Sequence, residues 1–454
     1  MRFRNGESGQ MIVMLAISMT ALMGFMALAV DVGILFHVRR EVQIAADAAA
    51  EAGALDYHYN PSGSTASAAA LAAASQNGVT NGSNGRTVNV TFPTSGSYGS
   101  PYTTGFVEAV VTVPNPTMFM RLFGMTSVNL VSSAVAGPGA SQGCVWSLGG
   151  AGTGISGSGA LNASGCEIYD NSNIGTALDL TGGSISAKQV GVTGGFSGSV
   201  RPTPITGMIP VPDPLASLAA PGIPRSSGSG CNTQRIYTAG SHTLGSGCYD
   251  GISISGGSLT LTGGNYVING NISASGNATV IFDSGNYIIN GNLAHSSSGT
   301  VTLDSGSYTI SGTLSNSGSG PLSLSSGQYV VEGGLDLTGS GAATGTGVSF
   351  YTGGASTLSG RVNLTAPIGG ADNGILIFQA VGDTSPMTIQ ETGSMTLQGI
   401  VYAPSASLSI GGSGSSNVYA DFVVGSLDIT GSPQLQNYAL VNRGTPLTKI
   451  VMVQ

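Results

Sequence analysis

The strongest pattern of apolar and polar positions is a 21-residue repeat in the second half of the chain. Tyrosine recurs at this spacing, with one glycine two residues before each copy and another four residues after it. Four apolar columns keep the same register. The repeated tyrosines are Tyr266, Tyr287, Tyr308 and Tyr329, and the first apolar column is Leu259, Val280, Val301 and Leu322. Alternating segments, separated by poor helix formers, predict about three short strands per unit.

The repeat length predicts a parallel β-helix. One 21-residue unit cannot bury its own apolar face, so the units are expected to stack. Parallel strands about 4.8 Å apart would turn each apolar column into an internal ladder, and Asn265 with Asn286 could form an amide ladder. We expect first rungs at 141–200, a proline-rich excursion at 201–235, the main β-helix at 236–440 and a tail at 441–454. A β-sandwich is the alternative fold, and the strict repeat argues against it.

The N-terminal part of the chain predicts a membrane anchor. Residues 11–30 carry no charge, and a helix of that length spans a bilayer core of about 30 Å. Arg2 and Arg4 precede the run, which favours a cytoplasmic N-terminus. We therefore expect a cytoplasmic stub at 1–10, a transmembrane helix at 11–34 that contacts the lipid bilayer, and export of the remainder. The alternative is a signal peptide cleaved after Ala27-Leu28-Ala29.

Residues 35–140 predict a continuation of the helix followed by a small α+β module. Val38, Val42, Ala45 and Ala49 form a stripe at helical spacing. Residues 38–52 could use this stripe against helices of other proteins or against the module itself. Strands are expected at 87–92, 106–113 and 128–135, and a short, mostly buried helix at 117–125. Gly137-Pro138-Gly139 marks a domain boundary.

Charge and composition exclude several classes of protein. The 454 residues include only 13 basic and 21 acidic side chains, for a net charge of −8. A nucleic-acid-binding protein needs a clustered basic surface, so we expect no nucleic-acid partner. Disorder is disfavoured because 41% of the residues are hydrophobic. A mainly β, exported repeat protein fits these values.

The four cysteines predict disulfides in an oxidising compartment. Cys144 and Cys166 are 22 residues apart, about one rung, which puts equivalent Cα atoms within disulfide range. Cys231 and Cys248 are 17 apart and form the other plausible pair. Four cysteines allow three pairings, and free buried thiols are the alternative. No zinc site is expected, because no His or second Cys stands at ligand spacing.

Candidate chemistry in the repeat is sparse. Asp283 and Asp304 occupy one column, four residues before a repeat tyrosine, and would stack about 5 Å apart. They could belong to a calcium or polysaccharide-cleaving site, but two acids more often cap corners. The tyrosine column could face sugars, although internal packing is favoured. The four histidines are scattered, so we expect no catalytic residue, no metal and no cofactor.

The N-terminal third resembles a known family. Ala29-Val30-Asp31-Val32-Gly33, Ala45-Ala46-Asp47-Ala48-Ala49-Ala50 and Arg121-Leu122-Phe123-Gly124 are similar to Tad-type (Flp) pilus-assembly proteins of the TadE/TadG-like class. Asp213-Pro214 and Gly263-Gly264-Asn265-Tyr266 resemble β-helix regions that follow such N-termini in bacterial envelope proteins. The resemblance implies a single-pass protein of the bacterial inner membrane, with its bulk in the periplasm or at the cell surface, that contacts other pilus-machinery proteins.

We therefore expect a non-enzymatic envelope protein with a structural or adhesive role in pilus assembly or surface adherence. An external surface or a polysaccharide is the candidate ligand of the solenoid face. One alternative is a secreted protein that binds or cleaves polysaccharides, which would need a cleft of acids and bases. A second alternative is a minor pilin-like subunit, although Met14 stands where a pilin-type signal places glutamate after Gly9.

Overall fold

The chain folds into two compact units. The computed structural model describes residues 8–60, 62–92, 105–225, 231, 233–391, 395–413, 417–442 and 444–452, so most of the expected stub at 1–10 lies outside the described residues. The first unit, here the N-terminal module, comprises residues 1–139 and 448–454. The second unit, the solenoid, comprises residues 140–447 and is thus inserted within the sequence of the first. Each unit is described by itself below.

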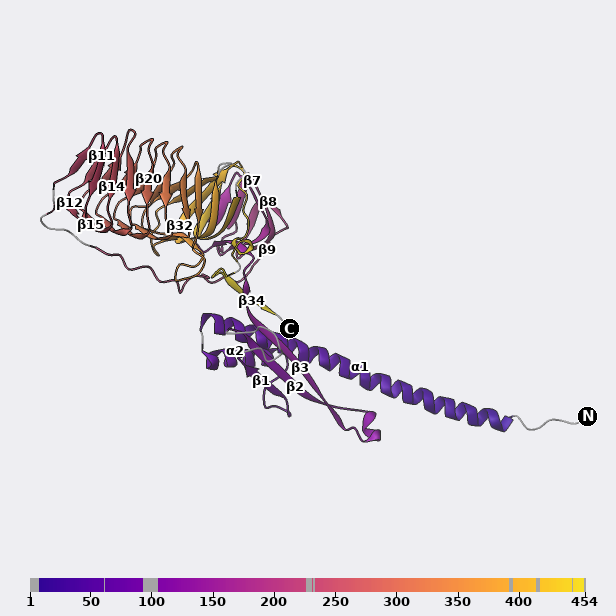
Figure 1. Cartoon of the computed structure of the whole chain (residues 1–454). Helices are drawn as coiled ribbons and strands as arrows, with labels where there is room; N and C mark the ends of the chain where they lie inside the picture. The colour runs from indigo at the N-terminus through magenta and orange to yellow at the C-terminus, as the bar shows by residue number, and fades with distance from the viewer. Residues whose placement is uncertain are drawn as a thin grey trace, which may run out of the picture. The chain divides into compact units, whose positions relative to one another are not determined.

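The N-terminal module combines two helices with a four-stranded sheet (Figure 1). The helices are α1 (Ser8–Tyr59) and α2 (Gly63–Gln76), and the strands, in their order across the sheet, are β1 (Thr87–Thr91), β2 (Val107–Pro116), β3 (Ser127–Ala140) and β34 (Thr448–Met452). Strands β1, β2 and β3 pair antiparallel. The expectation of a tail at 441–454 is therefore wrong for 448–452, because these residues supply the edge strand beside β3.

The stripe on α1 packs within the module itself. Val42, Ala45 and Ala49 are fully buried in one cluster with residues of α2, β1, β2 and β3. Small alanine side chains let the helices and the sheet approach closely, which explains their use along this face. The apolar stripe that could have met partner helices is therefore already covered by its own sheet and by α2.

The turn between β2 and β3 differs from its prediction. Residues 117–125 contain a short 3-10 helix, η1 (Met120–Phe123), as expected for a helical segment. The expected burial is wrong, because Leu122 and Phe123 are 80% and 84% exposed. Apolar character alone predicted burial inside the protein, and no other protein segment covers these side chains among the described residues.

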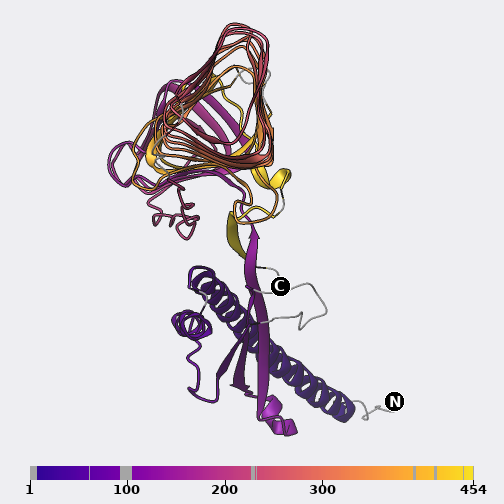
Figure 2. The ribbon, with the colours of Figure 1, turned by 60° about the vertical axis from the view of Figure 1, so that its left-hand side comes forward.

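The solenoid is a stack of parallel strands on three faces, and its end-on view has a triangular outline (Figure 2). One face consists of β10 (Arg235–Tyr237), β13 (Ile252–Ile254), β16 (Ile272–Ala274), β19 (Leu293–His295), β22 (Leu314–Asn316), β25 (Leu335–Leu337), β28 (Ser356–Leu358) and β31 (Met387–Glu391). The second consists of β11 (Ser241–Leu244), β14 (Ser258–Leu261), β17 (Thr279–Phe282), β20 (Val301–Leu303), β23 (Leu322–Leu324), β26 (Ala343–Thr346) and β29 (Val362–Thr365). The third consists of β12 (Gly247–Tyr249), β15 (Gly264–Ile268), β18 (Gly285–Ile289), β21 (Gly306–Ile310), β24 (Gly327–Val331), β27 (Val348–Thr352) and β30 (Ile375–Gln379).

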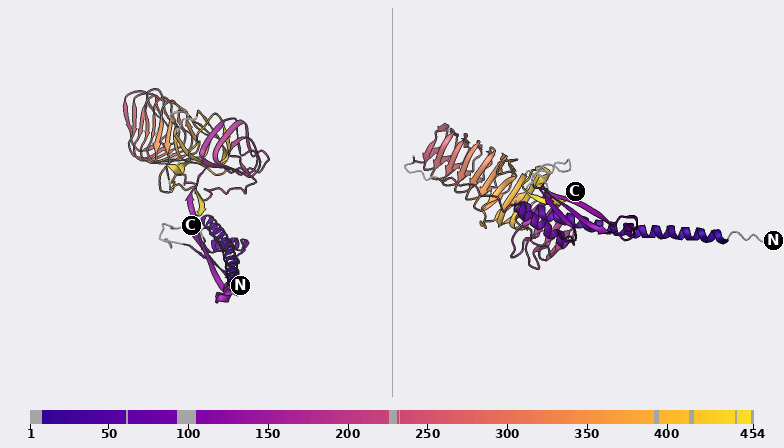
Figure 3. Two further views of the ribbon diagram at one scale, coloured as in Figure 1. Left: turned by 90° about the vertical axis from the view of Figure 1, so that its right-hand side faces the viewer. Right: turned by 90° about the horizontal axis from the view of Figure 1, so that it is seen from below.

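The register between rungs confirms the predicted parallel β-helix. Tyr266 pairs with Tyr287, and Leu259 with Val280, so the 21-residue repeat becomes one turn of the coil. The predicted amide ladder is present, since the Asn286 side-chain amide donates to Asn265 at 2.9 Å. The β-sandwich alternative is excluded by this continuous parallel stacking (Figure 3).

The rungs stack in an order different from the order in the chain. The remaining strands are β32 (Thr396–Gly412), β33 (Asn417–Ile429), β4 (Gly143–Ser147), β5 (Ile155–Gly157), β6 (Ala160–Asp170), β7 (Leu178–Val192), β8 (Phe196–Arg201) and β9 (Ile205–Thr206), with a 3-10 turn η2 (Tyr438–Leu440). Strand β33 pairs in parallel with β4 and β5, so the first rungs follow the last ones. The chain therefore enters in the middle of the stack, coils to one end at β9, and begins again at the other end with β10.

The proline-rich segment makes this arrangement feasible by crossing from one end of the solenoid to the other. The segment lies at the position of the predicted excursion at 201–235, since β8 ends at Arg201 and β10 begins at Arg235. Asn171 and Val211 exchange two hydrogen bonds, and the Tyr402 hydroxyl donates to Asp213 at 2.8 Å. The excursion is thus a strap fixed to the outside of the solenoid.

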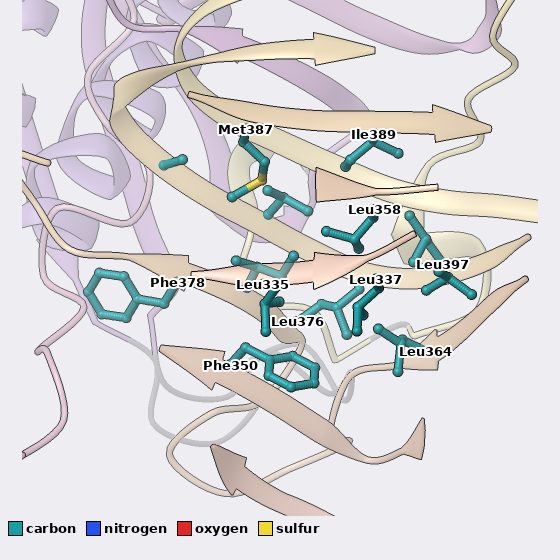
Figure 4. Packing of buried hydrophobic residues seen from close by; sticks show 14 of the residues in the cluster. Leu335, Leu337, Phe350, Leu358, Leu364, Leu376, Phe378, Met387, Ile389 and Leu397 are labelled. Atoms are coloured by element: carbon teal, nitrogen blue, oxygen red, sulfur yellow. The ribbon is translucent and has the colours of Figure 1, made fainter. Parts of the chain in front are cut away.

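The solenoid core is a continuous apolar column. Inward-facing side chains alternate with outward-facing ones along each short strand, as in the buried–intermediate–buried pattern of β22 and β25. Figure 4 shows Leu335, Leu337, Phe350 and Leu358 meeting in the interior. One rung alone cannot bury its apolar side chains, so the stability of the solenoid depends on contacts between neighbouring rungs.

Candidate functional site

The repeat tyrosines form a stack inside the solenoid. Each of the four side chains is at most 1% exposed. Neighbouring ring centroids are 4.9, 5.0 and 5.2 Å apart, with ring planes within 17° of parallel. Tyr249 and Phe350 extend the row at its two ends. These rings cannot offer a sugar-binding face, because no part of the column reaches the surface.

Each repeat tyrosine closes a corner of its own rung. The hydroxyl of Tyr308 donates to the carbonyl oxygen of Asp304 at 2.7 Å, and that of Tyr329 donates to Ser325 at 2.7 Å. Burial raises the pKa of these phenols, so they remain neutral donors. The backbone carbonyl at the corner thereby receives a hydrogen bond from within its own rung.

The glycines two residues before Tyr287 and Tyr308 permit these corners to stack tightly. A Cβ atom added at Gly306 would lie 2.1 Å from the carbonyl oxygen of Gly285 in the preceding rung. At Gly285 the corresponding distance to the Gly264 oxygen is 2.5 Å. Only glycine fits these positions, because the obstructing atom belongs to the backbone of a neighbouring rung.

The acidic pair lies at these same corners. Asp283 and Asp304 are half-buried, and their backbone N–H groups donate to Leu261 and Phe282 of the preceding rung. Their carbonyls accept the hydroxyls of Tyr287 and Tyr308. Within the residues that the structure describes, no group of three or more His, Cys, Asp or Glu side chains could hold a metal ion. The arrangement thus gives the two residues a defined part in corner geometry.

The cysteines form two disulfides. Cys144 bonds to Cys166 with a Cα–Cα distance of 5.4 Å, and Cys231 bonds to Cys248 with a distance of 4.7 Å. This is the pairing that the rung spacing favours. The first bond joins β4 to β6 in the middle of the stack, and the second ties the end of the strap to β12 in the terminal rungs.

The histidines occupy unrelated surroundings. His295 lies inside the solenoid, and burial lowers its pKa, so the ring is neutral. The ring of His242 packs against that of Tyr237 in the end rungs, tilted by 32° with centroids 4.5 Å apart. His37 lies beside Glu41 on α1, and His58 lies near the end of the same helix. The structure does not bring these side chains together.

One buried acid, Asp421, is a polar feature that the sequence patterns do not predict. Asp421 is 1% exposed, and burial raises its pKa to about 8. Its Oδ1 accepts the Tyr438 backbone N–H at 3.1 Å, while Oδ2 has no hydrogen-bond partner among the described residues. The available signal was an acid inside the apolar strand at 418–424. Its contact with η2 joins the last coil to the segment that closes the solenoid.

The first part of α1 has the surface of a membrane-spanning helix. Residues 11–30 leave their large apolar side chains exposed, with Phe25 at 70% and Leu22 at 62%. The helix contains an 18-residue window of mean hydropathy 2.2, none of which is buried within the protein. One N-terminal apolar helix of this kind fits a single-pass membrane protein.

Comparison with known families adds two matches. Residues 9–56, almost the whole of α1, match the putative Flp pilus-assembly TadE/G-like family. Residues 282–439 of the solenoid match a domain of unknown function (DUF7305). Neither the curated proteins nor the solved structures gave a significant match.

Proposed function

We propose that this chain is a single-pass protein of the bacterial inner membrane that serves Tad (Flp) pilus assembly, with its solenoid exported as a structural or adhesive element. The observation that carries the proposal is α1 itself. The TadE/G-like match, at residues 9–56, lies within one continuous 52-residue helix that exposes apolar side chains in its first part and packs on a small module in its second. An anchor and a folded module thus share one rigid element.

The topology supports a display role for the solenoid. The backbone N–H of Ser141 donates to Leu447 at 3.1 Å, so the two ends of the inserted unit lie together. The anchoring module can therefore carry the solenoid as an insertion between β3 and β34. Two disulfides suit an oxidising compartment outside the cytoplasm. A cytoplasmic N-terminus follows from the positive-inside rule.

A non-enzymatic role is part of the proposal. The repeat supplies backbone corners and internal ladders, and its tyrosines donate to the backbone carbonyls of those corners. A surface or polysaccharide ligand would then bind by shape and hydrogen bonding on an outer face. Cleavage of polysaccharides would instead require opposed acids on a common cleft.

The test is a comparison of three strains: wild type, a deletion of the gene, and a variant in which residues 142–446 are replaced by a short Gly-Ser linker. Pili are counted by electron microscopy, attachment is scored on abiotic surfaces, and the protein is located by fractionation. We expect the protein in the inner-membrane fraction and fewer pili or less attachment in the deletion strain. Retained pili with lost attachment in the linker variant would assign adhesion to the solenoid. A soluble cytosolic protein would contradict the proposal.

A further inference from the structure

The turn between β2 and β3, here called the hairpin tip (residues 117–125), has an unusual composition. Six of its nine residues are large and apolar, whereas turns of soluble hairpins are rich in Gly, Asn and Asp. Leu122 and Phe123 are 80% and 84% exposed, and Met118 is 60% exposed. The tip is nevertheless well organised, since Gly124 ends η1 in the left-handed region and Thr117 bonds to both Met125 and Thr126.

The hairpin tip is fastened to α1 through Asp31. The two carboxylate oxygens of Asp31 accept the backbone N–H groups of Met118, Phe119 and Met120 at 3.0, 2.8 and 2.6 Å. Asp31 is the one charged residue in 11–34, and it is only 2% exposed. A carboxylate within an apolar span needs such partners, because an unsatisfied charge there is costly. The tip therefore covers and satisfies the charge of the anchor helix.

Beyond Asp31 the hairpin tip extends along the membrane-spanning part of α1 (Figure 1). Phe119, Leu122 and Phe123 share an apolar cavity of about 380 Å³ with α1 residues that include Met23 and Leu28. Met23 precedes Asp31 by eight residues, or about 12 Å along a helix. A tip in contact with this part of α1 lies within the bilayer whenever α1 spans it.

We infer that the hairpin tip is a second membrane-inserted element, which places its apolar side chains among lipid acyl chains in the leaflet through which α1 leaves the bilayer. The inference rests on the proposed membrane anchoring of α1. Acyl chains are the occupant that fits the cavity and the exposed side chains, since the same depth of α1 faces lipid. Arg121, the one charged residue of the tip, can extend its long side chain to lipid phosphates.

The test uses fluorescence quenching in the full-length protein. The chain has one tryptophan, Trp146, which is buried in the solenoid and gives a constant background. Phe123→Trp reports on the tip, Phe25→Trp on the anchor, and Leu55→Trp on an exposed site of α1 beyond the membrane. Each variant is reconstituted in phosphatidylglycerol–phosphatidylcholine liposomes with and without bromine on the acyl chains.

We expect brominated lipid to remove most of the added emission in Phe123→Trp and Phe25→Trp, with a blue-shifted maximum, and to leave Leu55→Trp unchanged. If Phe123→Trp folds poorly, Leu122→Trp repeats the measurement at the adjacent residue, which is also highly exposed. Quenching of Phe25→Trp without quenching of either tip variant would overturn the inference and assign the tip to a protein surface. An unquenched Phe25→Trp would instead overturn the anchoring of α1, and this inference with it.

Discussion

The ring of Tyr287 stacks on that of Tyr308 with centroids 5.0 Å apart and ring planes 8° from parallel. The two residues are 21 positions apart in sequence and directly paired in β18 and β21. Their hydroxyls both donate to the carbonyl four residues earlier. One column therefore provides apolar contact between rungs and a hydrogen bond within each rung, which couples the stacking of the coil to the geometry of its corners.

Truncation of this column should destabilise the solenoid strongly. Tyr308→Ala removes a ring that lies between two other rings and is only 1% exposed. We expect the free energy of unfolding to fall by about 3–5 kcal/mol. Tyr308→Phe keeps the stack but leaves the Asp304 carbonyl without its donor, at a cost of about 1–1.5 kcal/mol. Denaturant titration of the detergent-solubilised protein, followed by circular dichroism, measures both. Equal losses in the two variants would show that stacking contributes little.

The glycine column makes a separate prediction about backbone spacing. In Gly306→Ala the new Cβ would meet the Gly285 oxygen at 2.1 Å, so the rungs must separate. We expect a destabilisation of about 1–3 kcal/mol, typical of overpacking. Gly245→Ala is the matched control, because nothing lies within 4 Å of its added Cβ. Thermal melting should separate the variants, and equal melting temperatures would contradict the close approach.

The fold class of the solenoid could be predicted because the repeat is strict. Tyr266 and Tyr329 keep their spacing through four units, and a periodic sequence leaves few ways to bury its apolar columns. The stacking order could not be predicted, because β4 and β33 have no repeat in common. The strap that joins β9 to β10 makes this order possible, and its contacts through Asp213 and Asn171 leave no periodic trace.

The N-terminal module shows a second limit of sequence patterns. Apolar periodicity identified the stripe at Val42 and Ala45, and both residues are buried. The same criterion failed at Leu122 and Phe123, because a hydrophobic pattern does not state whether protein or lipid will cover a side chain. The contact of Asp31 with the hairpin tip joins residues 87 or more positions apart, and no apolar or polar pattern in either segment indicates that the two meet.

Asp421 should make the stability of the solenoid depend on pH. Burial raises its pKa from 3.8 to about 8, so the folded chain holds a proton that the unfolded chain has released. The free energy of unfolding therefore falls as the pH rises from about 4 to about 8. Asp421→Asn mimics the protonated acid and should raise the melting temperature at pH 8 while leaving it unchanged at pH 4. The exposed Asp250→Asn is the control and should show no such difference.

Loss of the two disulfides should have different effects, one on the stability of the solenoid and the other on its terminal rungs alone. Cys144→Ser/Cys166→Ser removes a bond between residues 22 positions apart in the middle of the stack. We expect the free energy of unfolding to fall by about 3 kcal/mol. Cys231→Ser/Cys248→Ser frees the strap at the terminal rungs, where neighbours lie on one side only. Hydrogen exchange should then increase only in β10–β12. Loss of protection throughout the solenoid in this second variant would contradict local fraying.

Asp31 should control the position of the hairpin tip. Asp31→Ala removes the acceptor of three backbone N–H groups, and each hydrogen bond to a charged group contributes about 1.5–3 kcal/mol. We expect the amide protons of residues 118–120 to exchange at least about tenfold faster in the liposome-reconstituted protein, since about 1.4 kcal/mol changes an opening equilibrium tenfold. The exposed Glu51→Ala on the same helix is the matched control and should leave this exchange unchanged. Unchanged exchange in Asp31→Ala would mean that apolar contacts with α1 hold the tip without the carboxylate.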